Sequence, residues 1–493
     1  MGSRRIAILG AGISGLCTGI ALKRAGIHSF TIYEKSDRLG GTWYDNSYPG
    51  AACDVPSPLY SFSFEPNPGW SRMFSPQPEI QRYLAGCAEK YGLLPHIRFG
   101  SEIAAASFDE AAGSWHLRSA AGEALEADVV VSGTGQLNRP HVPDLPGLGD
   151  FEGTQFHSAR WSHGHDLAGE NVVVVGNGAS AIQFIPQIAP RVKQLTVLQR
   201  SANWVVPRMD FAFSERAKQR FRRFPFLLTL LRWFVYWQLE FRFFGFLRDS
   251  WLSRRLERGC RQYLEACIAD PKLREVLTPD YPIGCKRILI SDDYYQSLCR
   301  DNVAVVTSPI ERILPGGVRT ADGRVHPADT LIFATGFETT SFLAPMQIEG
   351  LGGRKLEEVW REGAEAYLGV AVADFPNLFL LYGPNTNLGH NSIIFMIECQ
   401  VGYVVQCIRE LFGRDLDWLD VRREAQARYN AELQRDLGKT AWAAGCSSWY
   451  KTASGKVTNN WSGFTVDYWR RTRHPRFGDF TGRRPRGAGP ASA

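Results

Sequence analysis

Residues 172–181 read VVVVGNGASA, an apolar helical pattern continues through Ile185, and residues 195–200 read LTVLQR. This succession of strand, glycine turn, helix and strand is typical of a dinucleotide-binding βαβ unit. Gly176 permits a tight turn, Gly178 lets backbone N–H groups approach a pyrophosphate, and a small third residue brings the helix onto the strand. The N-terminus of this helix is therefore predicted to bind a pyrophosphate.

A second copy of this pattern stands at the start of the chain, where residues 6–15 read IAILGAGISG and residues 30–34 read FTIYE. Glu34 and Arg200 lie at the same distance after the first glycine of their copies, where a side chain meets the adenosine ribose. A carboxylate accepts hydrogen bonds from a bare ribose diol, whereas a guanidinium forks onto a 2′-phosphate. The first unit is thus expected to bind FAD or NAD and the second NADP. A chain that binds both a flavin and NADPH is expected to be an oxidoreductase, and the alternative is one binding unit beside one purely structural unit.

Length and composition narrow the possibilities. A chain of 493 residues is long enough for two or three domains with full cores. The net charge of +6 is small for this size, so no nucleic-acid partner is predicted. The ten cysteines form no Cys-x-x-Cys pair, which argues against a redox dithiol and against a metal site such as zinc. This cysteine usage fits a reducing cytosol. The sequence leads directly into the first strand without a signal peptide, so we expect a cytoplasmic protein.

The remaining pattern predicts an α/β fold with two Rossmann-like dinucleotide-binding domains, one for FAD and one for NADP, and a helical insertion. A helix is expected over residues 77–91, and strands over residues 102–108, 114–118, 127–132, 303–307, 330–333 and 378–381, with a further helix from about Ser392. The predicted domains are 1–145 with 337–493 for FAD, 146–210 with 281–336 for NADP, and 211–280 for the insertion.

The insertion is rich in Phe, Trp, Leu and Arg and has a helical period from Phe211 to Ala269. Its charges interrupt the apolar run too often for a transmembrane helix. Three interpretations remain: a helical insertion packed on the nucleotide domain, an entrance for a lipophilic substrate, or a basic helix that contacts a membrane surface.

Two further motifs carry a family resemblance that spans nearly the whole chain. Residues 151–161 resemble the Phe-x-Gly-x-x-x-His-x-x-x-Trp signature of type I Baeyer-Villiger monooxygenases, and residues 40–54 resemble that family's Gly-Gly-x-Trp, Tyr-Pro-Gly and Asp pattern. Related N- and S-oxygenating flavin monooxygenases usually carry Tyr or Phe where Trp161 stands. Two departures are Ser162, where Pro or Asp normally follows, and Ala52, where many members carry Arg.

The resemblance implies an FAD- and NADPH-dependent enzyme that inserts one oxygen atom of O2 beside a ketone carbonyl through a C4a-peroxyflavin, giving an ester or lactone. The substrate is then a ketone, and the aromatic insertion suggests a lipophilic one. One alternative is N- or S-oxygenation on the same fold, and another is a flavoprotein that only releases peroxide.

The resemblance also implies roles for single residues. Arg287 matches the active-site arginine, Asp54 the acid that holds it, Arg200 and Lys286 the 2′-phosphate ligands, and Trp449 a contact to the nicotinamide ribose. A permanently charged guanidinium stabilises anionic oxygen species, and a buried one needs a counter-ion. His157 is expected to link the domains without touching the reacting atoms. The other predicted cofactor-binding residues are Gly10, Gly12, Gly15, Glu34, Thr42, Trp43, Tyr60, Gly176, Gly178, Ala179, Ser180, Gln183, Ser201 and Thr335, and the signature residues are Phe151, Gly153, His157 and Trp161.

Overall fold

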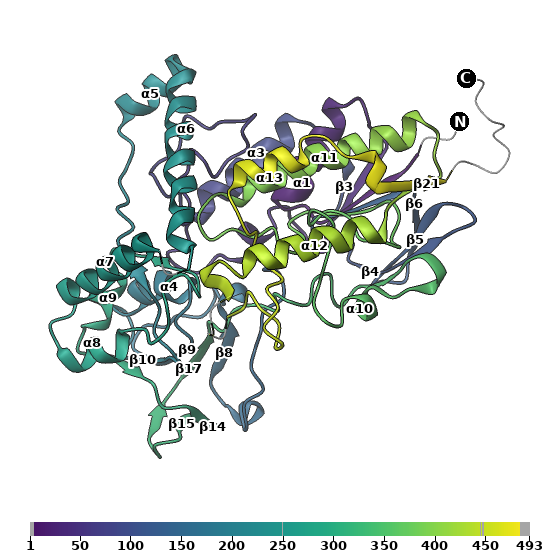
Figure 1. The fold of residues 1–493 in the computed structure, drawn as a ribbon. Coiled ribbons are helices and arrows are strands. Elements are labelled where there is room, and N and C mark those ends of the chain that lie inside the picture. Colours follow the sequence, from purple (N-terminus) through teal and green to yellow (C-terminus); the bar gives the residue numbers. More distant parts are fainter. Residues whose placement is uncertain (1–3, 249, 444, 446–447, 484–493) are drawn as a thin grey trace, which may run out of the picture.

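The computed structural model describes residues 4–248, 250–443, 445 and 448–483. Two five-stranded sheets, each wholly parallel, lie at the centre of the two halves of the molecule (Figure 1). Their strand orders are β19-β7-β1-β2-β3 and β13-β10-β9-β17-β8. All strands of the second sheet lie in sequence between β7 and β19 of the first, so the chain leaves the first sheet, builds the second and returns. The predicted α/β class with two Rossmann-like units is confirmed.

The first sheet contains the first glycine fingerprint. Its strands are β1 (Ile6–Leu9), β2 (Phe30–Tyr33), β3 (Ile97–Arg98), β7 (Val129–Ser132) and β19 (Leu378–Leu380). Helix α1 (Ile13–Arg24) packs against the long α11 (Ile393–Gly413) and against α3 (Gln77–Lys90), and all three belong to the largest hydrophobic core. Both α3 and α11 lie where the sequence predicts helices.

A four-stranded sheet of order β18-β4-β5-β6 flanks this unit. Its strands are β4 (Ile103–Asp109), β5 (Ser114–Ser119), β6 (Ala124–Ala127) and β18 (Gln347–Glu349). The strand predicted over residues 127–132 is confirmed from Val129 onward as β7, but its start is not, because Ala127 ends β6 in another sheet. Between them the Asp128 carboxylate accepts a hydrogen bond of 2.6 Å from the backbone N–H of Arg5, which accompanies the change of sheet.

The second sheet contains the second fingerprint. Its strands are β8 (Thr154–His157), β9 (Asn171–Val175), β10 (Gln194–Leu198), β13 (Val303–Val306) and β17 (Thr330–Phe333). Helices α4 (Ala181–Ile188) and α9 (Tyr294–Leu298) pack together on it. A small antiparallel sheet lies below (Figure 1), formed by β14 (Ile310–Leu314), β15 (Gly317–Thr320) and β16 (Val325–Pro327).

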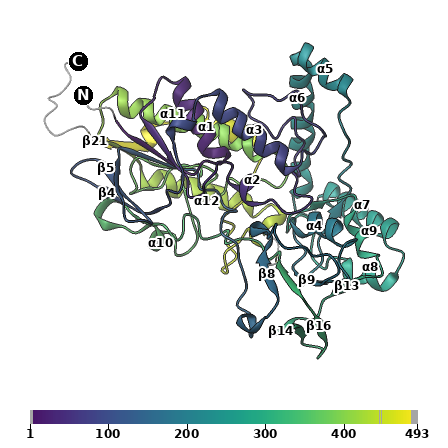
Figure 2. The ribbon, with the colours of Figure 1, turned by 180° about the vertical axis from the view of Figure 1, so that it is seen from behind.

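A helical segment separates the paired two-residue strands β11 (Val205–Val206) and β12 (Leu289–Ile290). It consists of α5 (Glu215–Arg223), α6 (Pro225–Phe241), α7 (Trp251–Cys267) and α8 (Pro271–Leu277). Figure 2 shows α5 and α6 standing at one edge of the molecule and α7 and α8 beside the second sheet. One face of α6 is attached to the first unit, because Arg232 donates to the carbonyls of Pro58 and Ser61 at 2.9 and 3.0 Å.

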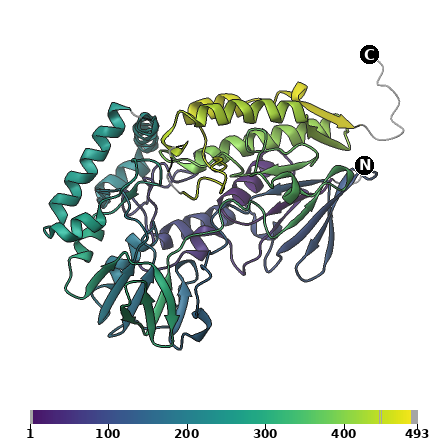
Figure 3. The ribbon, with the colours of Figure 1, turned by 60° about the horizontal axis from the view of Figure 1, so that its bottom comes forward.

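The C-terminal part returns to the first unit, where helices and a strand pair cover one side (Figure 3). Its elements are α12 (Arg423–Leu437), α13 (Thr465–Thr472), β20 (Trp418–Val421) and β21 (Phe480–Arg483), and the short helices elsewhere are α2 (Thr42–Asp45) and α10 (Leu356–Val359). In the part of the chain that the structure covers, no helix has the length and apolar character needed to cross a bilayer.

Two connections run side by side between the parallel sheets. Backbone N–H of His141 donates to the carbonyl of Gly336 at 2.9 Å, and that of Glu338 donates to Arg139 at 3.0 Å. Pro140 and Phe337 form the bridge between these hydrogen bonds. The two connections are therefore hydrogen-bonded to each other, and residues of both line a cavity.

Candidate functional site

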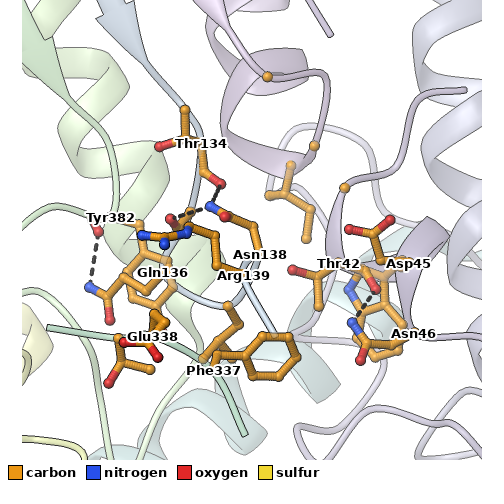
Figure 4. A pocket seen from close by; sticks show the side chains of 18 of the residues that line it. Thr42, Asp45, Asn46, Thr134, Gln136, Asn138, Arg139, Phe337, Glu338 and Tyr382 are labelled. Atoms are coloured by element: carbon orange, nitrogen blue, oxygen red, sulfur yellow. Dashed lines mark hydrogen bonds between the residues drawn. The ribbon is translucent and has the colours of Figure 1, made fainter. Parts of the chain in front are cut away.

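A cavity of about 820 Å³ lies where the carboxyl ends of both parallel sheets meet. Both fingerprints, both connections and the loop of residues 40–55 contribute to its wall. Figure 4 shows Thr42, Asp45 and Asn46 on one side of it and Gln136, Arg139 and Glu338 on the other. The carboxyl edge of parallel strands is where open α/β sheets bind ligands, and this volume is in the range of small-molecule sites.

The first fingerprint presents a helix N-terminus to this cavity. Gly10 and Gly12 line it, whereas Gly15 lies behind them, where an added Cβ would collide with the carbonyl oxygen of Gly10. Glycine at position 15 thus lets α1 approach β1 closely. Glu34 follows β2, is buried and lines the cavity, and its carboxylate accepts the backbone N–H groups of Ala11 at 2.7 Å and Ser36 at 2.8 Å. These bonds fix the carboxylate with lone pairs left for a ribose diol.

The aromatic loop lies against the same wall. Thr42 opens α2 and lines the cavity together with Trp43 and Tyr60. The indole N–H of Trp43 donates to the hydroxyl of Tyr60 at 3.0 Å, and Gln77 donates to the Trp43 carbonyl. This network fixes both rings at the cavity.

The second fingerprint lies on the opposite side. Gly178, Ala179 and Ser180 line the cavity, whereas Gly176 does not. Apart from the two chain neighbours, no atom of the described residues lies within 4 Å of the position that a Cβ would take at Gly178, so the backbone there faces open space.

Gln183 of α4 joins the two halves. Its side-chain oxygen accepts the Tyr48 hydroxyl at 3.0 Å and the Ala52 N–H at 3.3 Å, and its nitrogen donates to the Ala52 carbonyl at 3.0 Å. The Tyr-Pro-Gly loop of the first unit is therefore attached to the first helix of the second. This placement gives Gln183 a positioning role beside the predicted contact with the cofactor.

Arg200, which follows β10, and Lys286, which precedes β12, lie near each other. Lys286 donates from Nζ to the Ser201 hydroxyl at 2.7 Å and lines the cavity, whereas Arg200 and Ser201 are not among the lining residues. Burial and the positive charge of nearby Arg200 both lower the pKa of Lys286. Two cations that destabilise each other form a site at which an added dianion would be favourable.

Arg287 and Asp54 form an ion pair across the two halves. Nε of Arg287 donates to Oδ2 of Asp54 at 3.0 Å, and Nη2 donates to the same oxygen. The carboxylate raises the pKa of Arg287. Both side chains are 31% exposed and both line the cavity, and Nη1 of Arg287 donates to no residue of the described chain. The pair can therefore hold an anion without giving up a proton.

None of the four signature residues lines the cavity. Phe151 is buried in the core of the second unit, and a Cβ at Gly153 would collide with the carbonyl of Asp329. The ring of Trp161 packs on Phe184 with 5.3 Å between centroids. The signature residues therefore contribute packing contacts in the second unit and do not form part of the cavity wall.

His157 ends β8, buried beside the Phe337 ring of one connection at 5.8 Å between centroids. Its Nδ1 accepts the Ala159 N–H at 3.1 Å, so the proton of the neutral ring is on Nε2. Burial lowers the pKa of His157 to about 4. A neutral histidine packed against the connection agrees with a linking role.

The structure adds cavity residues that the sequence patterns did not indicate. Gln136 donates to the Tyr382 carbonyl at 3.0 Å, and its side-chain oxygen is buried without a partner among the described residues (Figure 4). Tyr382 follows β19 and donates to Asn387 at 2.7 Å. Its position after a buried parallel strand is the signal that could have identified it. The predicted residues Thr335 and Trp449 also line the cavity.

The structure also bears on metal ligands and on cysteine chemistry. Among residues 4–248, 250–443, 445 and 448–483, no group of His, Cys, Asp and Glu could hold a metal ion. Cys285, directly before Lys286, is disulfide-bonded. The absence of a Cys-x-x-Cys pair therefore does not show that the chain lacks a disulfide, because a disulfide requires two cysteines close in space and not in sequence.

Two dinucleotide-binding units that face one cavity, with an acid at the first ribose position and a cation pair at the second, define an oxidoreductase of the flavin- and nicotinamide-dependent class. Residues 3–243 match the family of flavin-binding monooxygenase-like proteins. A Baeyer-Villiger monooxygenase of Pseudomonas aeruginosa is 45% identical over 463 residues, which cover 94% of this chain and 88% of that protein. One of Streptomyces coelicolor is 43% identical over 485 residues, which cover 98% and 93%. A solved structure of OTEMO in complex with FAD and NADP matches with a TM-score of 0.88 at 26% identity, covering 97% of this chain and 99% of that one.

The chain therefore belongs to the Baeyer-Villiger monooxygenases. It is an FAD- and NADPH-dependent monooxygenase of that type, and the predicted family, enzyme class and cofactors are confirmed.

Proposed function

We propose that this enzyme converts a lipophilic ketone, O2, NADPH and a proton into an ester or lactone, water and NADP⁺, and that Arg287 held by Asp54 is its catalytic centre. The observation that carries the assignment is the ion pair between Arg287 and Asp54 at the shared wall of the two dinucleotide units. No other part of the cavity wall combines a permanent cation with a fixed counter-ion, as far as the described residues show.

The wall fits FAD at the first unit. The N-terminus of α1 at Gly12 has no side-chain cap, so its N–H groups suit a pyrophosphate. Glu34 suits the adenosine ribose, and the unpartnered buried oxygen of Gln136 offers an acceptor to a polar ring edge. The N-terminus of α11, reached through Asn391 and Ile393, supplies a positive dipole end for negative charge on the ring.

The wall fits NADPH at the second unit. Gly178 leaves the helix N-terminus open to a pyrophosphate, and Arg200 with Lys286 and Ser201 suits a 2′-phosphate. Trp449 lines the cavity and would contact the nicotinamide end. On this basis we assign residues 1–145 and 337–493 to FAD binding, 146–210 and 281–336 to NADP binding, and 211–280 to the helical insertion.

When bound, NADPH supplies a hydride and the reduced flavin supplies activated dioxygen. The chain's part is electrostatic. Arg287 places a fixed positive charge where negative charge develops on oxygen, and Asp54 keeps the guanidinium plane oriented through two hydrogen bonds to one oxygen. Because arginine stays protonated, it stabilises the anion without quenching it. Each ~1.4 kcal/mol of such stabilisation gives about a tenfold gain in rate.

The ketone assignment rests on the rest of the wall. Apolar side chains line the cavity from several elements: Val55, Leu289, Phe337, Leu388 and Trp449. Ala52 also lines it, so a methyl group stands where many family members carry an arginine. A bulky, weakly polar ketone suits this environment better than a charged amine, which would lie beside the guanidinium of Arg287.

The test uses the FAD-loaded enzyme with NADPH and ¹⁸O2 on a matched panel of cyclic and linear ketones, tertiary amines and sulfides. Mass spectrometry should find one ¹⁸O atom in esters or lactones from ketones. Oxygen label only in N-oxides or sulfoxides would contradict the ketone assignment. Stoichiometric peroxide with every compound would mean that the chain only oxidises NADPH.

A further inference from the structure

The outer face of α6 exposes a continuous apolar stripe to solvent. We define this stripe by its members, which are 43% to 68% exposed: Phe226, Leu230, Trp233, Phe234, Trp237 and Phe241. Their spacing of three and four residues places them on one side of the helix. A surface helix normally exposes polar residues to solvent, whereas this face of α6 exposes apolar ones.

The stripe is not a failure of packing, because α6 has a separate buried face. Leu228, Val235, Tyr236 and Leu239 are buried, and Tyr236 hydrogen-bonds Thr465 of α13 at 2.9 Å. The helix is thus held firmly on the first unit while its stripe points outward. Figure 1 shows α6 at the edge of the molecule with α5 near its end.

Exposed apolar residues concentrate in this region. Of the 17 large hydrophobic side chains exposed in the described chain, 11 lie between Met209 and Trp251. None of the stripe residues lines the cofactor cavity. The stripe therefore does not belong to the site described above.

Positive charge flanks the stripe at both ends. Helix α5 exposes Arg216, Arg220, Arg222 and Arg223 beside its N-terminal end, and α7 exposes Arg255 and Arg258 beyond its C-terminal end. Glu215 is the only exposed acid among residues 211–248 and 250–258. A partner that complements this face would therefore present an apolar surface with negative charges around it.

We propose that α6 lies in the surface of an anionic lipid bilayer, with its aromatic stripe among the headgroups and the arginines on lipid phosphates. At 17 residues α6 is about 26 Å long, too short and too firmly packed on its inner face to span, but suited to lie flat. Trp and Phe favour this interface, and the cytoplasmic leaflet supplies anionic lipids. A second copy of the chain fits less well, because antiparallel pairing of two α6 helices would bring basic α5 toward basic α7.

Such binding would place the enzyme where lipophilic ketones partition. The inference does not depend on the proposed reaction, since the stripe and the cavity share no residue.

The test is flotation of the FAD-loaded full chain with phosphatidylcholine vesicles, with and without phosphatidylglycerol. The chain should float with the anionic vesicles at low salt and lose most of that binding at high salt. The triple variant W233S/F234S/W237S should bind at least about a hundredfold more weakly, since three large aromatic contacts are removed. The variant R216Q/R220Q/R222Q/R223Q should lose the preference for anionic vesicles.

A matched control changes exposed apolar residues elsewhere, L94S with F99S, and should float like the unaltered chain. NADPH oxidation without vesicles should be equal in all variants, which shows that each is folded. Failure of the unaltered chain to float, or unchanged flotation of the triple variant, would overturn the proposal. A dimer in light scattering that the triple variant abolishes, without vesicle binding, would overturn it in favour of a second copy.

Discussion

Arg200→Ala should separate the two nicotinamide cofactors. Arg200 lies close enough to Lys286 to lower its pKa, and a single 2′-phosphate could bind both cations. A hydrogen bond to a charged partner contributes about 1.5–3 kcal/mol, and the lower end applies because the Arg200 side chain is exposed. The KM for NADPH should thus rise about 10-fold to 30-fold. The KM for NADH, which lacks the phosphate, should change less than about twofold.

The assay is initial-rate NAD(P)H oxidation by the FAD-loaded enzyme at fixed ionic strength. Lys193→Ala is the matched control, because it removes an exposed cation from the other end of the same strand. It should leave both KM values unchanged. The double variant of Arg200 and Lys286 should lose less than the sum of the single effects, since the two share one ligand. Equal changes for NADPH and NADH in Arg200→Ala would refute the reasoning.

Three further outcomes are expected. Asp54→Asn should lower the ester formed per NADPH. It should also lower the unfolding free energy by about 1 kcal/mol, because a half-buried guanidinium loses its counter-ion. An unchanged product yield would remove Asp54 from the site. His157 has a pKa near 4 in the folded chain against 6.5 ordinarily, so its contribution to stability is complete above pH 6.5 and is lost as the pH falls toward 4. Urea unfolding at pH 7 and 5 should show about 2 kcal/mol more loss in the unaltered chain than in His157→Asn, and parallel losses would contradict this. Gln183→Ala should increase the protease sensitivity of the loop at Tyr48, measured by limited proteolysis. An unchanged digestion pattern would mean that the hydrogen bonds of Gln183 to Tyr48 and Ala52 do not hold this loop in place.

The fold was predictable because its deciding signals are local. Buried parallel strands are continuous apolar runs, and the glycines that follow are required by close approach, as at Gly15 in the first turn of α1. The predicted strand over residues 330–333 matches β17, and the predicted helix at 77–91 matches α3 to one residue. The strand predicted at 127–132 begins two residues too early, because an apolar run does not show where the chain changes sheet.

The site was predictable only in part. Glu34 and Arg200 follow from a fixed spacing, but the pairing of Asp54 with Arg287 joins residues 233 positions apart and needed the family resemblance. Gln136 and Tyr382 lie in loops after strands, and their approach to each other is visible only when the strands are assembled. The outward stripe of α6 has the same composition as a buried helix, so sequence could not decide among the three interpretations of residues 211–269.

The most direct test of the central claim measures ester formed per NADPH consumed by Arg287→Ala, with Arg287→Lys beside it. If the guanidinium stabilises negative charge during oxygen transfer, the alanine variant should still oxidise NADPH and release peroxide while ester falls by at least about a hundredfold. The lysine variant should recover part of the ester yield, because it restores the charge without the fork to Asp54. Full ester yield from Arg287→Ala would show that this arginine is not the catalytic centre.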